Sequence, residues 1–67
     1  MIEIELNGDP HQLVASTSVT ELLQQLGLAE KRVAVEYNLD ILPKSQHAHT
    51  AIQSGDRIEI VHAIGGG

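Results

Sequence analysis

Hydrophobic and polar residues alternate near both ends of the chain, and a period of two residues is typical of a β-strand with one buried face. Residues 2–6 alternate isoleucine or leucine with glutamate. Residues 57–62 repeat the pattern, with Ile58 and Ile60 separated by Glu59. We therefore predict one strand at the start of the domain and another at its end.

The sequence Asn7-Gly8-Asp9-Pro10 follows the first strand and is dense in turn-forming residues. Asn-Gly is the strongest short signal for a β-hairpin, so we expect residues 11–15 to return as a short antiparallel strand.

The middle of the chain predicts two more strands and an irregular connection. Residues 32–37 alternate as a third strand, and a short strand at residues 41–42 follows a turn. Residues 44–52 show no clear period, which favours an irregular or 3₁₀ connection that Ile52 anchors to the core.

A single helix is predicted between the second and third strands. Ser18 and Glu21 fit a capping box, in which the Ser18 hydroxyl accepts from the Glu21 amide and the Glu21 carboxylate accepts from the Ser18 amide. Apolar residues at helical spacing follow: Val19, Leu22, Leu23 and Leu26. Gly27 fits a left-handed cap, with Leu28 placed to contact Leu23 in a Schellman motif.

This order of elements predicts an α+β fold in which a mixed β-sheet of four to five strands is covered on one face by a single main helix. In the grasp-like version of this order, the first and last strands lie side by side and parallel in the middle of the sheet. We expect a β-grasp domain over residues 1–62 and a flexible glycine tail over residues 63–67.

Composition narrows the possible functions. The 67 residues contain no cysteine, so neither a disulfide nor a thiolate metal site is possible. The formal charge is −5, and the four basic residues are scattered along the sequence, which argues against a nucleic acid partner. No segment resembles a signal peptide or a membrane span, and we expect a cytoplasmic protein.

An enzyme is not predicted, because the chain has no glycine-rich phosphate loop and no G-x-S-x-G motif. His47 and His49 are two residues apart, with His11 and His62 further away, but no recognisable fourth ligand accompanies them. We therefore predict no metal site and interpret these histidines as solvated or capping residues.

The chain ends Ala63-Ile64-Gly65-Gly66-Gly67, directly after the last predicted strand. Glycine has no Cβ, so such a tail is narrow enough to enter another protein's active site and present the Gly67 carboxylate there. A frayed end is the alternative interpretation, and the tail alone leaves both open. If the tail is functional, Val61, His62 and Ile64 are candidates for docking a partner.

Over its full length the chain resembles the ubiquitin-like β-grasp sulfur carriers, and most closely those of thiamine biosynthesis. The resemblance depends on the isoleucine-rich first strand, on the terminal glycines and on four internal segments, which are residues 18–23, 33–38, 41–43 and 54–62.

The resemblance implies that a ubiquitin-activating-type enzyme uses ATP to adenylate Gly67, while the carrier itself binds no cofactor. Sulfur from a persulfide donor would then convert Gly67 to a thiocarboxylate, which thiazole synthase would use to build the thiazole ring of thiamine. Gly65 and Gly66 would thread the tail into the partner's active site.

Two alternatives stay open. One is a carrier like the small subunit of molybdopterin synthase, and the other is a ubiquitin-like interaction module or protein modifier.

Overall fold

The alternating segments from the two ends of the chain form neighbouring strands in the middle of one sheet. The computed structural model describes residues 1–62. The sheet has five strands in the order β2-β1-β7-β4-β5, which are β1 (Ile2–Leu6), β2 (Asp9–Leu13), β4 (Val33–Tyr37), β5 (Asp40–Leu42) and β7 (Arg57–His62). β1 and β7 are parallel, and the other neighbouring pairs are antiparallel. The predicted mixed sheet and its central parallel pair are confirmed.

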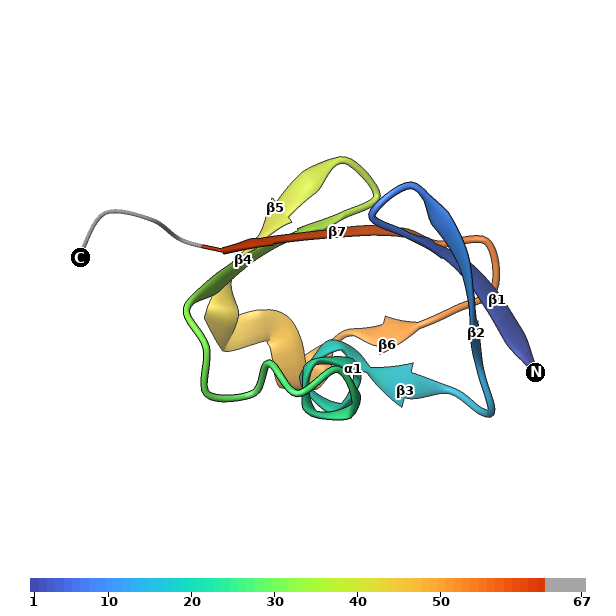
Figure 1. The fold of residues 1–67 in the computed structure, drawn as a ribbon, viewed down its shortest axis with the longest axis horizontal. Coiled ribbons are helices and arrows are strands. Elements are labelled where there is room, and N and C mark those ends of the chain that lie inside the picture. Colours follow the sequence, from blue (N-terminus) through green and yellow to red (C-terminus); the bar gives the residue numbers. More distant parts are fainter. Residues whose placement is uncertain (63–67) are drawn as a thin grey trace.

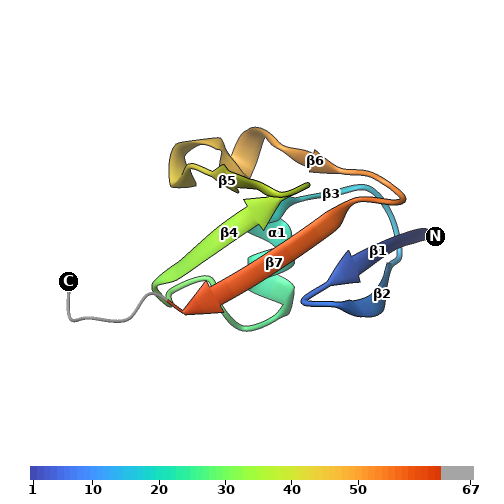
Figure 2. The ribbon, with the colours of Figure 1, turned by 90° about the horizontal axis from the view of Figure 1, so that it is seen from above.

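The helix α1 (Val19–Gln25) lies against one face of this sheet (Figures 1 and 2). Both hydrogen bonds of the predicted capping box between Ser18 and Glu21 are present. At the other end Gly27 adopts φ +75°, and the Leu28 amide donates to the Leu23 carbonyl at 2.8 Å, which is the Schellman pattern. Hydrogen bonds between residues close in the sequence therefore fix both ends of the helix.

The first hairpin is tighter than predicted. Its loop is only Asn7-Gly8, with φ values of +51° and +86°, so β2 begins at Asp9 and not at residue 11. Two successive positive φ values match the right-handed twist of the strands, and only residues such as Asn and Gly adopt them at low cost. Leu6 pairs directly with Asp9 as a result.

A second, two-stranded sheet was not predicted from the sequence. It pairs β3 (Thr17–Ser18) with β6 (Ala51–Ile52) in antiparallel register. β6 follows the 3₁₀ helix η1 (Lys44–His49), so the predicted 3₁₀ connection is correct but shorter than expected. Ile52 is fully buried and anchors this segment, as predicted.

The core lies between the large sheet and the layer made by α1 and the small sheet (Figure 1). Its buried residues are Ile4, Leu13, Val19, Leu22, Leu23, Val35, Ile52, Ile58 and Ile60. Among the described residues, no helix is both long and apolar enough to cross a membrane.

Candidate functional site

The central strand β7 connects the core to the end of the described chain. Ile58 and Ile60 are 0% and 8% exposed, whereas Val61 between Ile60 and His62 is 58% exposed. Side chains alternate along a strand, so Val61 lies on the outer face of the sheet, opposite the helix. His62 is exposed and pairs with Val33 at the start of β4. Val61 and His62 therefore stand together at the end of the sheet where the tail begins.

The other predicted site residues, Ile64, Gly65, Gly66 and Gly67, lie outside the described residues. The predicted tail and its reactive carboxylate therefore remain predictions.

The outer face near Val61 combines apolar and acidic side chains. Val61 pairs with Ala34 across β4 and β7, and Glu59 pairs with Glu36. Glu36 pairs in turn with Ile41 of β5, whose side chain is 67% exposed. Apolar residues beside carboxylates suit a partner surface that offers apolar contacts together with Lys or Arg.

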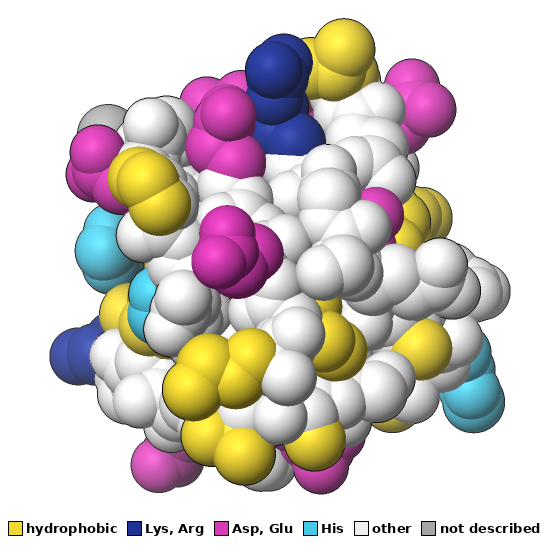
Figure 3. Space-filling model, turned by 90° about the vertical axis from the view of Figure 1, so that its right-hand side faces the viewer, with side chains coloured by type: hydrophobic (Ala, Val, Ile, Leu, Met, Phe, Trp, Pro, Cys, Tyr) yellow, Lys and Arg dark blue, Asp and Glu magenta, His cyan; other side chains and the backbone are white. Residues whose placement is uncertain are grey.

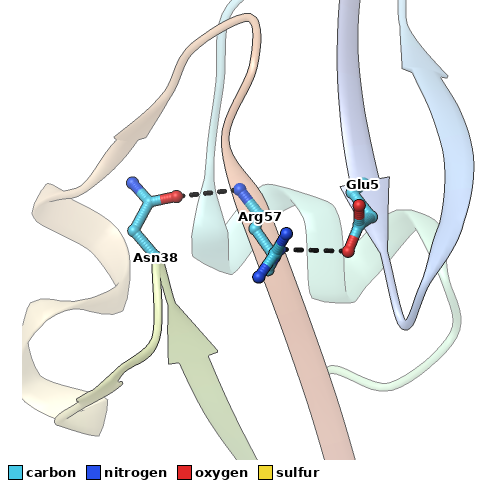
Figure 4. Close-up of polar contacts among 3 residues, drawn as sticks. All are labelled: Glu5, Asn38 and Arg57. Carbon is cyan, nitrogen blue, oxygen red and sulfur yellow. Dashed lines mark hydrogen bonds and ion pairs between the residues drawn. The ribbon is translucent and has the colours of Figure 1, made fainter.

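At the opposite end of β7, Arg57 links this strand to β1 and to the turn between β4 and β5 (Figure 4). Its guanidinium lies 3.1 Å from the Glu5 carboxylate of β1, and its backbone amide donates to the Asn38 side chain at 2.8 Å. Both Arg57 and Glu5 are about half exposed, so the ion pair itself adds little stability. The hydrogen bond to Asn38 contributes more, because it gives the Arg57 backbone amide an acceptor in place of a strand partner at the point where β4 turns into β5.

Asp56 organises the loop before β7. Its carboxylate accepts hydrogen bonds from the Tyr37 hydroxyl, the Asn38 amide and the Gln53 backbone amide. Desolvation by burial, the hydrogen bond to Asp56 and the charge of Asp56 together raise the pKa of Tyr37 to about 12. These contacts fix the direction in which the chain enters β7.

Asn7 extends the pairing between β1 and β7. Its backbone amide donates to the Ile58 carbonyl at 2.9 Å, and its side-chain oxygen accepts from the Ile60 amide at 2.7 Å. The direct register of the two strands covers only two residue pairs, which are Glu5–Arg57 and Leu6–Ile58. The hairpin turn therefore secures β7 one residue before Val61.

The histidines do not form a metal centre within residues 1–62, where no group of three or more potential ligands comes together. His47 and His49 were both expected to be solvated or capping residues; His49 is exposed, whereas His47 is not solvated. His47 is 7% exposed, and its Nε2 lies 3.3 Å from the Leu42 carbonyl oxygen. The aperiodic sequence of η1 did not indicate this burial.

Comparison with known proteins places this geometry in a family. The sequence model of the ThiS family matches residues 4–67. The chain is 35% identical over 66 residues to the sulfur carrier protein ThiS of Escherichia coli, and the match covers 98% of this chain and 100% of that protein.

Two further relatives extend the comparison. The crystal structure of the thiamine biosynthesis protein ThiS from Geobacter metallireducens superimposes with a TM-score of 0.86 at 33% identity, covering 98% of this chain and 100% of that chain. The thiazole synthase of Paramagnetospirillum magneticum is 46% identical over 66 residues, which is 98% of this chain but only 20% of that protein. The chain thus spans about a fifth of the length of that relative.

A family match over nearly the whole chain, a full-length match to a sulfur carrier and a superimposable β-grasp structure agree with one another. The chain belongs to the ThiS family of sulfur carrier proteins.

Proposed function

We propose that this chain carries sulfur for thiazole formation in thiamine biosynthesis as a thiocarboxylate on Gly67. The observation that carries the proposal is that the family match runs through Gly67, so that the glycine tail belongs to the matched sequence. The position of β7 supports it, because this central strand leads straight from the core to the tail.

The proposed chemistry begins with activation of the carboxylate. An ionised carboxylate is a poor electrophile, so an ATP-dependent enzyme of the ubiquitin-activating type first transfers AMP to Gly67 and releases pyrophosphate. The terminal sulfur of a persulfide donor then attacks the acyl carbon, and AMP leaves with the bonding electrons. A thiol next attacks the inner donor sulfur of the resulting S–S bond, which releases the thiocarboxylate with the outer sulfur and leaves the inner donor sulfur joined to the attacking thiol as a disulfide.

The carrier supplies no catalytic group in this scheme. It binds no cofactor, and ATP is a substrate of the activating partner. Because the chain contains no cysteine, no side-chain thiol competes for the sulfur. Gly65 and Gly66 provide a narrow path into the partner's active site, and the partner provides the orientation.

The direct test is the mass of the intact protein after incubation with ATP, the activating enzyme and a persulfide donor. The proposal requires an increase equal to the replacement of one oxygen by sulfur, located by fragmentation at Gly67. A chain without Gly67 should stay unchanged in mass while retaining the circular dichroism of the folded domain. An unchanged mass for the full chain, or a tail joined to a lysine, would contradict the proposal.

Docking by the outer face is tested with Val61→Asp. We expect this change to weaken binding of the activating enzyme without unfolding the domain, because Val61 is exposed beside the start of the tail. Val14→Asp is the matched control: Val14 is 86% exposed and follows β2 at the opposite end of the sheet. Equal affinity of the two variants would remove Val61 from the docking surface.

A further inference from the structure

A pocket of about 330 Å³ lies between the end of α1 and η1, on the side of the molecule away from the outer sheet face. Its apolar floor includes Leu23, Leu28 and Val33, and the buried His47 also lines it. A smaller pocket of about 180 Å³ adjoins it and shares Leu23, Lys44 and His47. Together they form one groove, which we call the helix-side groove.

The fold gathers basic residues around this groove. Lys31, Arg32 and Lys44 line the larger pocket, and they are three of the four Lys and Arg residues of the chain. Only one of the nine acidic residues, Glu30, lines it with them. Lys31 and Arg32 are neighbours in the sequence, and the fold brings Lys44 to the same pocket.

These three cations have no ion-pair partner among residues 1–62, where the single ion pair is Arg57 with Glu5. All three are exposed. Exposed, unpaired cations above an apolar floor can be neutralised by a partner without first breaking an internal contact.

The remainder of the described domain is acidic. The outer sheet face carries Glu36 and Glu59 close to Val61, and acidic side chains outnumber basic ones at the end of the molecule remote from the tail (Figure 3). The helix-side groove is therefore a local reversal of charge on a protein with a net charge of −5.

The groove also adjoins the start of the tail. Lys31 and Arg32 immediately precede Val33, which lines the groove and pairs with His62, the last residue of β7. Figures 1 and 2 both place the start of β4 beside the end of β7. A partner that holds the tail can therefore reach the groove at the same time.

From this arrangement we propose that the helix-side groove docks an acidic segment of thiazole synthase, with an apolar side chain in the pocket and carboxylates against Lys31, Arg32 and Lys44. The proposal deepens the proposed function and rests on it. It assigns the two sides of the carrier, near the start of the tail, to two different partners.

The choice of thiazole synthase follows from charge and from the comparisons. The activating enzyme must hold the phosphates of ATP with positive groups near the Gly67 carboxylate, so the acidic outer face complements it better than the groove does. The helix side is then left for the second partner. A thiazole synthase contains a segment 46% identical to this chain, which favours that enzyme as the second partner.

The experiment measures the affinity of the full chain for the thiazole synthase of the same organism by calorimetry, at low and at high salt. Lys44→Glu is compared with Arg57→Glu, because each changes the net charge equally while Arg57 lies at the far end of β7. We expect Lys44→Glu to weaken binding at least about threefold and Arg57→Glu less than about twofold. Reversing a charge inside the contact surface weakens binding more than reversing one outside it. The triple change of Lys31, Arg32 and Lys44 to Glu should weaken binding at least about tenfold and reduce the salt dependence.

Each outcome separates this inference from the proposed function. Equal effects of Lys44→Glu and Arg57→Glu, or no binding of the wild-type chain, would overturn the groove as the docking site, whatever the sulfur-loading assay shows. An equal loss of sulfur loading by the activating enzyme in Lys44→Glu would reassign the groove to that enzyme and also overturn the proposal. If the triple variant has a lower melting temperature than the wild type, the single variants Lys31→Gln and Lys44→Gln, which each remove one positive charge, replace it in the binding experiment. Unchanged affinity of both for thiazole synthase would refute docking in the groove.

Discussion

Asn7 is the residue whose substitution tests most directly how the carrier holds its last strand. Its side-chain oxygen accepts the Ile60 amide at 2.7 Å, and its backbone adopts φ +51°. Two properties are therefore combined in one residue, an acceptor for a shielded amide and tolerance of a left-handed conformation. Different substitutions separate them.

Asn7→Gly keeps the conformation but removes the acceptor. Ile60 is 8% exposed, so its amide loses its partner with little access to water, and we expect a loss of about 1–3 kcal/mol in the free energy of unfolding. Asn7→Ala removes the acceptor and also places a Cβ in the left-handed region, which adds about 1 kcal/mol. Asn7→Asp keeps both an acceptor oxygen and the tolerated conformation, so its loss should stay below about 1 kcal/mol.

These losses are measurable against the expected stability. A domain of this length is stable by about 3–10 kcal/mol, so the glycine variant should stay folded in water. Urea unfolding followed by circular dichroism ranks the variants by their free energy of unfolding. Hydrogen exchange gives the location, because the Ile60 amide should lose protection in Asn7→Gly while the amides of β4 change less.

The reasoning is refuted if Asn7→Gly is as stable as the wild type, or if its Ile60 amide remains as protected as before. The first result would mean that water satisfies the amide, and the second that the strand does not depend on the turn.

Three further predictions concern other parts of the fold. Ser18→Ala should lower the free energy of unfolding by about 1 kcal/mol in urea denaturation, because the capping hydrogen bond is lost, whereas Ser16→Ala should change it little. Leu39→Gly should raise it by about 0.5–1 kcal/mol, because Leu39 has φ +76° and an exposed side chain; a lower urea midpoint would contradict this. Tyr37 is the only tyrosine, so its absorbance on titration should give a pKa near 12, and Asp56→Asn should move this pKa back toward 10. Since the raised pKa belongs to the folded state, stability should be complete below pH 10 and decline between about pH 10 and 12; an unchanged pKa in Asp56→Asn would exclude the role of Asp56.

The sequence predicts best the features whose partners are close along the chain. The capping box joins Ser18 to Glu21, and the Schellman motif joins Leu23 to Leu28, so each lies within a window that pattern reasoning covers. Both strands of the central parallel pair were found because each alternates by itself. Their pairing followed from the order of elements and not from any local signal.

The features that the sequence missed depend on distant partners. β3 and β6 have two residues each, too few to show a period, and they become strands only because the fold places Thr17 opposite Ile52. The Asn7 side chain was assigned to a turn alone, because its partner Ile60 is 53 residues away. Nothing along the chain marks such a pair.

The candidate site also has one feature that local sequence predicts and one that depends on distant residues. Exposure of Val61 could be predicted, because the alternation of Ile58 and Ile60 determines which face their neighbour occupies. The helix-side groove could not, since Lys44 approaches Lys31 and Arg32 only when η1 packs beside the end of α1. Charge scattered in a sequence is therefore weak evidence against a charged site.

The position of β7 bears on our proposal that so small a domain serves two partners with one tail. β7 is hydrogen-bonded to β1 on one side and to β4 on the other, and its pairing with β4 continues to His62. The position of His62 at the end of β7 is thus fixed by the backbone of the fold, without help from a partner. A partner then needs only a contact beside that point, and the structure offers one on each side: the outer face at Val61 and the helix-side groove at Val33. In the proposed scheme the two contacts lie on opposite sides of the same strand end, so that each partner presents its active site to the same tail while touching a different surface.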